Sequence, residues 1–237
     1  MRNDTIKINS KNTKMIAHRG VSGVECENTA AAFIAAGNRT YFGIETDVHV
    51  PADGVFVIIH DDNTGRVCDT NVSVDGGTWA ELSSLILHDA DGVSRRDLHI
   101  PLLEDYIQIC RHYNKMAVLE LKNSFKKEDI AKILEICGTE GIIYITFDTQ
   151  NLIYLRELSD TAMGQLLTHT TVSDEQIAFM QKYRMDLDAR YPWATKENID
   201  KMHGLGIKVN LWTVDDPAVA EQLVEWGVDY ITSNILE

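Results

Sequence analysis

The sequence of 237 residues is poor in cysteine and proline, with four of each. The widely spaced cysteines form neither a C-x-x-C motif nor a zinc-finger spacing with histidine, so they predict no disulfide framework and no structural zinc site. No stretch approaches the roughly 18 apolar residues of a membrane span, and residues 1–10 lack the apolar run of a signal peptide. We therefore expect a cytoplasmic protein without stable membrane insertion.

Positive charge is also scarce, since 22 Lys and Arg face 36 Asp and Glu and the formal net charge is -14. A polyanion such as duplex nucleic acid, or an acidic membrane, would be repelled. An anionic ligand must therefore be a small molecule that meets locally concentrated positive charge. A hydrophobic content of 44% is typical of a globular protein, and the length suits one α/β barrel or two smaller domains. These features do not predict the oligomeric state.

Short β-branched runs alternate with amphipathic stretches from residue 115 onward, which indicates strand-helix units around a parallel sheet. Six strands are predicted there, at 115–122, 141–147, 161–168, 185–191, 207–214 and 228–234. Helices are predicted between them at about 128–138, 149–159, 173–183, 195–204 and 217–226, and four of these begin at capping residues: Asp148, Ser173, Thr195 and Asp216. Two earlier strands, 14–20 and 41–48, with a helix at 28–36 between them, bring the number of strands to eight. The sequence thus predicts a (β/α)8 TIM barrel of the α/β class.

The pattern breaks after the second strand, where Pro51-Ala52-Asp53-Gly54 leads directly into a strand-like run at 55–60. This link is too short for a parallel crossover, so an antiparallel hairpin is predicted. Residues 61–101 are polar and rich in turns, with one short helix at 78–87, and a helix at 102–112 returns the chain to the third strand. We therefore predict a single domain, 1–237, with an insertion at about 61–101.

Acidic residues gather at two predicted strand ends. Alternate strand residues share a face, so Glu45 lies beside Asp47, and Glu120 beside Lys122. If both pairs point into the barrel mouth, three carboxylates meet and must take up protons or bind a cation. Ligation by oxygen alone favours one hard divalent cation, Mg2+ or Ca2+. The alternative is that these carboxylates only bond to the backbone and to neighbouring Arg and Lys side chains.

Two histidines are predicted at the same end of the barrel. His18 and Arg19 end the first strand, and a hairpin centred on residues 52 and 53 places His60 roughly opposite Glu45. Two histidines can divide the general base and general acid roles. A metal ion with Arg19 and Lys122 would neutralise a phosphoryl group, so the set suits phosphodiester cleavage.

These residues lie in motifs that resemble those of the glycerophosphodiester phosphodiesterase family, from about residue 14 to 234. H-R-G alone would be weak, but the motifs in this order are a specific signal. They are His18-Arg19-Gly20, Glu27-Asn28-Thr29, Glu45-Thr46-Asp47, His60-Asp61, Ile100-Pro101-Leu102-Leu103-Glu104, Glu120-Leu121-Lys122, Leu211-Trp212-Thr213-Val214 and Asp229-Tyr230-Ile231-Thr232.

The resemblance implies a TIM barrel with a small insertion that cleaves glycerophosphodiesters to glycerol 3-phosphate and an alcohol. It implies one bound Ca2+ or Mg2+, and a route through a cyclic phosphate formed by the neighbouring glycerol hydroxyl. The implied roles are acid and base for His18 and His60, metal ligands for Glu45, Asp47 and Glu120, phosphate contacts for Arg19 and Lys122, and pocket lining for Trp212.

The sequence departs from the family pattern near the loops that would shape the substrate pocket. Cys26 replaces a usual proline, Thr232-Ser233-Asn234 replaces a usual Thr-Asp, and 66–71 replaces a frequent R-T-T-N-G run. The alcohol is therefore not predicted. Two other functions are considered, a phospholipase C-like or D-like enzyme acting on a lipid phosphodiester and a non-catalytic barrel that binds a phosphate ligand.

Other residues are given structural roles. Glu27-Asn28-Thr29 is predicted to cap the first helix, with Glu27 the weaker site candidate, and His49 to lie beyond the carboxylates toward the hairpin turn. The remaining histidines are predicted to be solvated on helix or loop surfaces: His88, His99, His112, His169 and His203.

Overall fold

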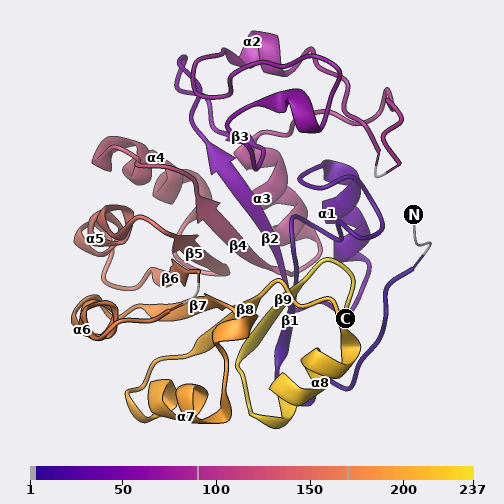
Figure 1. Ribbon diagram of the computed structural model, residues 1–237. Coiled ribbons are helices and arrows are strands. Elements are labelled where there is room, and N and C mark those ends of the chain that lie inside the picture. The colour runs from indigo at the N-terminus through magenta and orange to yellow at the C-terminus, as the bar shows by residue number, and fades with distance from the viewer. Residues whose placement is uncertain (1–3, 90, 170) are drawn as a thin grey trace.

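Eight parallel strands form a closed barrel in the computed structural model, which describes residues 4–89, 91–169 and 171–237 (Figure 1). The order around the barrel is β1, β9, β8, β7, β6, β5, β4 and β2, and pairing of β1 with β2 closes it. The predicted TIM barrel is therefore confirmed. The barrel strands are β1 (Lys14–Ala17), β2 (Gly43–His49), β4 (Met116–Leu121), β5 (Ile142–Thr146), β6 (Met163–Thr168), β7 (Asp186–Arg190), β8 (Val209–Trp212) and β9 (Tyr230–Ser233).

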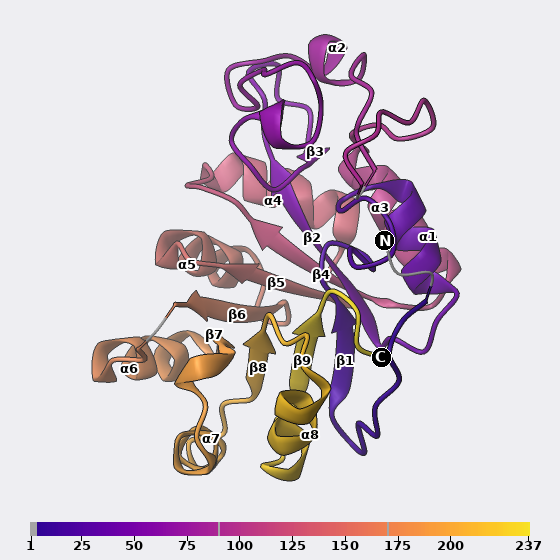
Figure 2. The ribbon, with the colours of Figure 1, turned by 45° about the vertical axis from the view of Figure 1, so that its right-hand side comes forward.

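Helices surround the barrel, as the two views in Figures 1 and 2 show. The side chains of all four predicted capping residues accept a hydrogen bond from a backbone N–H at the start of their helices, and Pro217 is the first residue of α8. The helices outside the insertion are α1 (Ala30–Gly37), α3 (Leu103–His112), α4 (Lys127–Cys137), α5 (Thr149–Leu158), α6 (Asp174–Tyr183), α7 (Lys196–Gly204) and α8 (Pro217–Glu225), and η2 (Tyr191–Trp193) is a single 3-10 turn.

Strand alternation divides the barrel residues into two sets. Side chains such as Ile44 and Leu119 point outward and join the apolar layer beneath the helices. Their neighbours point inward, and a smaller apolar cluster that includes Ile16, Val118 and Ile143 fills the interior. Farther along the same inward rows, toward the carboxyl ends of the strands, the residues become polar. The fold thus positions the site on top of a packed interior.

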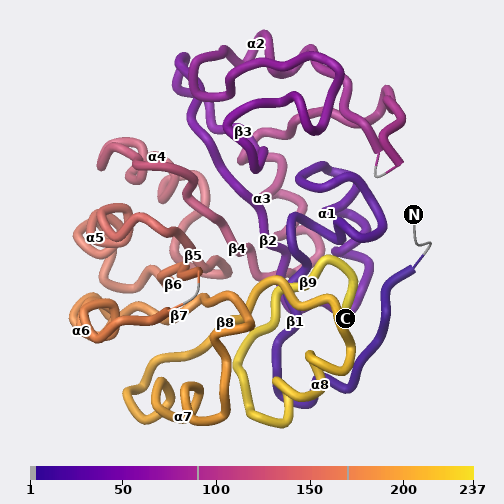
Figure 3. Tube along the Cα trace, viewed as in Figure 1, coloured from indigo at the N-terminus to yellow at the C-terminus, as the bar shows by residue number. Residues whose placement is uncertain are grey.

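The predicted antiparallel hairpin is present, and Figure 3 follows the chain as it returns beside β2 to form β3 (Val57–Ile58). Its register differs from the predicted one by one residue, because His49 pairs with Val57 and the loop contains an odd number of residues. Continued along the strands, this register places Thr46, not Glu45, opposite His60. The predicted pairing of Glu45 with His60 was therefore wrong.

The segment 61–101 lies beyond the end of β2, at the top of Figures 1 and 2. It contains η1 (Thr64–Arg66) and α2 (Trp79–Leu82). Its buried apolar residues, such as Cys68, Leu82 and Leu98, form a second cluster that also includes Cys26, Val57 and Ile59 from outside the segment. The helix predicted at 78–87 ends early, because the hydroxyl of Ser84 bonds back to the Glu81 carbonyl and the chain then extends.

The grouping of the whole chain into one domain with this insertion stays a prediction. Within the described ranges, no helix is both long enough and apolar enough to cross a bilayer.

Candidate active site

Three carboxylates from two adjacent strands converge at the barrel mouth. Glu45 and Asp47 are on β2 and Glu120 is on β4, where Asp47 and Glu120 are direct register partners. One oxygen from each lies within 4.8 Å of the others, and all three side chains are buried. Lys122 closes the cluster, with its Nζ 2.9 Å from Glu120 Oε1 and 3.6 Å from Asp47 Oδ1.

The pKa values of the three carboxyls are shifted in different directions. Burial, with the charges of Asp47 and then Glu120, raises the pKa of Glu45 well above its usual value. Burial and then Asp47 raise the pKa of Glu120 to about 7. Burial also acts on Asp47, but Arg19 and Lys122 overcome it and lower the pKa of that carboxyl to about 2. A divalent cation bound here would oppose these upward shifts, because it favours the charged form of each carboxylate.

The chemistry of these donors fits a hard cation. All three ligand atoms are carboxylate oxygens, the ligands that Mg2+ and Ca2+ take in proteins. Asp47 Oδ1 is buried and accepts no hydrogen bond from any described residue, although Lys122 Nζ is near it. A buried oxygen of this kind normally has a partner, and a cation would supply one.

Each of the two histidines has one ring nitrogen held by an acceptor. His18 Nδ1 lies 2.7 Å from Asn234 Oδ1, whose assignment is supported by the Asn234 amide nitrogen donating to Asp215. His60 Nδ1 lies 2.6 Å from Asp61 Oδ1. In each contact the ring N–H must donate from Nδ1, because the partner is an acceptor. A neutral ring then has an unprotonated Nε2, which can take up a proton.

Both histidines resist protonation in this environment. Burial, and then the charge of Arg19, lowers the pKa of His18 to about 4. Burial also lowers the pKa of His60, against the opposing effect of Asp47. His18 Nε2 is 4.0 Å from Glu45 Oε2, so the first histidine lies directly beside the carboxylate cluster.

Arg19, two residues after the end of β1, adopts a left-handed backbone conformation with φ of 52°. Its backbone N–H donates to Glu45 Oε2 at 2.8 Å and thereby fixes the orientation of that carboxylate. Its guanidinium donates from Nη1 to Glu27 Oε1 at 3.0 Å, and its Nε lies 3.5 Å from Asp47 Oδ2. Arg19 therefore extends across the cluster toward the loop that precedes α1.

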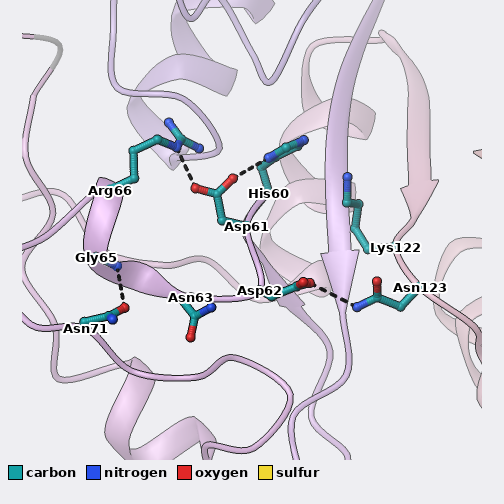
Figure 4. A pocket seen from close by; sticks show the side chains of 9 residues that line it. All are labelled: His60, Asp61, Asp62, Asn63, Gly65, Arg66, Asn71, Lys122 and Asn123. Carbon is teal, nitrogen blue, oxygen red and sulfur yellow. Dashed lines mark hydrogen bonds and ion pairs between the residues drawn. The ribbon is translucent and has the colours of Figure 1, made fainter. Parts of the chain in front are cut away.

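A cavity of about 390 Å³ connects these groups. Seven of the eight predicted site residues line it, and the eighth, Asp47, adjoins it as the third member of the carboxylate cluster. The seven are His18, Arg19, Glu45, His60, Glu120, Lys122 and Trp212. His60 and Lys122 also line a polar groove of about 770 Å³ beside the insertion (Figure 4).

Three aromatic side chains, Phe147, His169 and Trp212, form one wall of the cavity. His169 stacks on Phe147 with ring centroids 4.4 Å apart, and Trp212 meets both rings edge-on. His169 is exposed, as predicted, but its surface belongs to the cavity mouth and not to an ordinary solvated loop. His49, by contrast, lies outside the cavity and bonds to Asp75 and to the His60 carbonyl.

Six cavity residues were not among the predicted site residues: Ile145, Phe147, Leu167, His169, Asp188 and Thr232. Asp188 on β7 is almost fully buried, and its Oδ1 has no hydrogen-bond partner among the described residues. Burial and then the charge of Glu120 raise the pKa of Asp188 well above its usual value. All six lie in phase with the inward rows of their strands, so the alternation that placed Glu45 beside Asp47 predicts them as well when it is applied to every strand.

Comparison with known proteins places this chain in a family. Residues 18–236 match the glycerophosphoryl diester phosphodiesterase family. A glycerophosphodiester phosphodiesterase from Bacillus altitudinis is 34% identical over 232 residues, covering 92% of this chain and 93% of that protein. Glycerophosphodiester phosphodiesterase 1 from Bos taurus is 32% identical, covering 94% of this chain and 78% of that protein.

The solved structures show the same fold. A phosphodiesterase from Oleispira antarctica, in complex with the product sn-glycerol-3-phosphate, has a TM-score of 0.85 and 24% identity to this chain. The similarity covers 96% of this chain and 95% of that one.

Proposed function

Since the chain belongs to the glycerophosphoryl diester phosphodiesterase family, it hydrolyses glycerophosphodiesters, and we propose that it does so with one divalent cation and two histidines. The products would be glycerol 3-phosphate and an alcohol. The bound product in the Oleispira antarctica structure supports this proposal. The observation that carries it is one cavity where three converging carboxylates meet two histidines whose Nδ1 atoms are already bonded.

The carboxylates of Glu45, Asp47 and Glu120 would hold Mg2+ or Ca2+, whose charge would stabilise the negative phosphoryl oxygens. Arg19 and Lys122 would contact the same phosphoryl group from the rim of the cluster. Arg19 pairs with Asp47 and Lys122 with Glu120, so positive charge is already concentrated where the phosphate would bind.

Two proton transfers remain for the histidines. One Nε2 would accept the proton of the attacking oxygen, and the other ring, once protonated, would donate a proton to the departing alcohol. The attacking oxygen belongs either to water or to the neighbouring glycerol hydroxyl, which would give a cyclic phosphate that water then opens. Both routes need one proton acceptor and one proton donor. His18 and His60 can supply these in either route, because both line the cavity and they come from different parts of the chain.

The test is release of glycerol 3-phosphate from glycerophosphocholine, glycerophosphoethanolamine and glycerophosphoinositol. We expect release with Mg2+ or Ca2+, loss with EDTA and recovery when the metal is restored. Release that is insensitive to chelation would refute the metal proposal. No release from any substrate, with the metal bound, would favour a lipid phosphodiester as the substrate, and failure to bind metal would favour a non-catalytic barrel.

A further inference from the structure

One side chain of the insertion, Arg66, connects it to both sides of the active site. Arg66 Nη1 and Nη2 donate to the two carboxylate oxygens of Glu27, at 2.9 and 2.7 Å. Arg66 Nε donates to Asp61 Oδ2 at 2.6 Å. All three nitrogens of the guanidinium are thus used, on two carboxylates from different parts of the chain.

Each of those carboxylates holds a residue of the proposed machinery. Asp61 accepts from the Nδ1 of His60, a contact that Figure 4 shows in line with Arg66. Glu27 accepts from Arg19 Nη1 at 3.0 Å. A continuous chain of charged contacts therefore runs from His60 through Asp61, Arg66 and Glu27 to Arg19.

We propose that Arg66 is a positioning residue, which fixes the proton-transfer ring of His60 and the phosphate-binding guanidinium of Arg19 relative to each other. This inference rests on the proposed function. The two held residues follow separate strands, since His60 comes two residues after β3 and Arg19 two residues after β1. Small errors in such a distance are costly, because proton transfer requires hydrogen-bond reach.

Only an arginine suits this position. The guanidinium is planar and donates from three nitrogens at fixed angles, so it can bind one carboxylate with a fork and a second from Nε. A lysine can replace the charge but not this geometry. Without Arg66, Arg19 would be the one cation among the described residues still hydrogen-bonded to Glu27. That carboxylate would then draw the Arg19 guanidinium away from Asp47.

The contacts of Arg66 contribute little to the stability of the fold. Its side chain is 47% exposed, and ion pairs at such exposed positions add little to the stability of a fold. The insertion is held mainly by an apolar cluster that joins its buried residues to Cys26, Val57 and Ile59. Loss of Arg66 should therefore change turnover far more than it changes unfolding.

Arg95 provides a matched control within the same insertion. It donates to Glu25 at 2.9 Å and to both carboxylate oxygens of Asp97, so it also joins the insertion to the loop before α1. Within the described part of the chain, no hydrogen bond or ion pair joins Glu25 or Asp97 to the residues of the proposed machinery. Arg95→Met removes an equivalent link without affecting the positioned pair.

The experiment compares Arg66→Met, Arg66→Lys, Arg95→Met and the wild type, each saturated with Mg2+, for kcat and KM on glycerophosphocholine and for melting temperature. We expect kcat to fall about tenfold or more in Arg66→Met and by a smaller factor in Arg66→Lys, while Arg95→Met stays within about twofold. The two methionine variants should melt within a few degrees of each other. If Arg66→Met does not fold, Arg66→Lys must still lose turnover relative to Arg95→Met.

A double variant separates positioning from a general structural effect. If Arg66 acts through Asp61, adding Arg66→Met to Asp61→Asn should cost much less kcat than it costs in the wild type. Equal losses in both backgrounds, or equal kcat in Arg66→Met and Arg95→Met, would overturn the inference and leave the proposed function intact. Absence of turnover in the metal-saturated wild type would overturn the proposed function, and this inference with it.

Discussion

Glu45→Gln should separate metal binding from fold stability. The buried carboxylate of Glu45 favours metal binding, but in the absence of metal its burial lowers the stability of the fold. Its pKa is raised by burial and by two neighbouring carboxylates, so the metal-free folded state loses stability as the pH rises above the usual range of a glutamate. Glutamine keeps the shape and an oxygen that can accept from the Arg19 N–H. We therefore expect the metal-free variant to melt at the same temperature as the wild type or higher.

With saturating metal, the wild type should instead melt at a higher temperature than Glu45→Gln. A ligand at 100 times its dissociation constant stabilises a protein by about 2.7 kcal/mol, provided it binds only the folded state. In a chain of this size, 1 kcal/mol corresponds to about 2 to 4 °C, so saturating metal should raise the wild-type melting temperature by about 5 to 11 °C. Most of that rise should be missing in Glu45→Gln, where the three-carboxylate set is broken.

The assay is thermal unfolding at neutral pH with EDTA and then with increasing Mg2+ or Ca2+. Glu221→Gln is the control, since Glu221 is exposed on α8 and no hydrogen bond or ion pair of its side chain is found in the described chain. The control should keep the full metal-dependent rise. A full rise in Glu45→Gln, or none in the wild type, would refute the argument that these carboxylates form the cation site.

Three further predictions concern residues around the same cavity. His18→Ala or His60→Ala should lower kcat by about 100-fold or more with the melting temperature nearly unchanged, and near-normal turnover would remove that ring from the mechanism. Asp188→Asn should stabilise the protein at neutral pH, because burial raises the pKa of this carboxyl and the wild type is expected to lose stability above about pH 4. Denaturant titrations from pH 4 to 8 measure the stability of both proteins, and identical pH profiles would contradict this prediction. Gly20→Ala should lower the free energy of unfolding by about 1 to 3 kcal/mol, since Gly20 has φ of 74° and an added Cβ would meet the backbone of α1 at 2.7 Å; unchanged denaturant stability would disprove this.

Much of the barrel could be predicted because its signals are local. The eight strands follow from β-branched runs, and caps such as Thr195 follow from one side chain and the N–H that it meets two or three residues later. The family resemblance, carried by ordered motifs, is confirmed by the match over residues 18–236. The roles assigned to individual site residues remain predictions, although the structure brings those residues together.

The features that could not be predicted depend on long-range contacts and backbone geometry, which leave no local pattern in the sequence. The hairpin register was missed because the number of residues in a loop is decided by backbone geometry, here involving Gly54 with φ of 79°. The contact between Arg66 and Glu27 joins residues 39 positions apart through side chains with no periodic pattern. Asp188 was missed because its strand was examined for hydrophobicity and not for which face each residue occupies.

The insertion and the barrel interior keep separate apolar clusters, which has a consequence for protein engineering. A segment that packs internally can be exchanged as a block between relatives, provided that the few contacts across its boundary are kept. In this chain those contacts include the packing of the insertion's apolar residues against Cys26, Val57 and Ile59, and the ion pairs of Arg66 with Glu27 and Arg95 with Glu25. Chimeras that graft 61–101 from a relative onto this barrel should therefore vary the surface offered to the alcohol while retaining the three carboxylates, so that selectivity and metal binding can be altered independently.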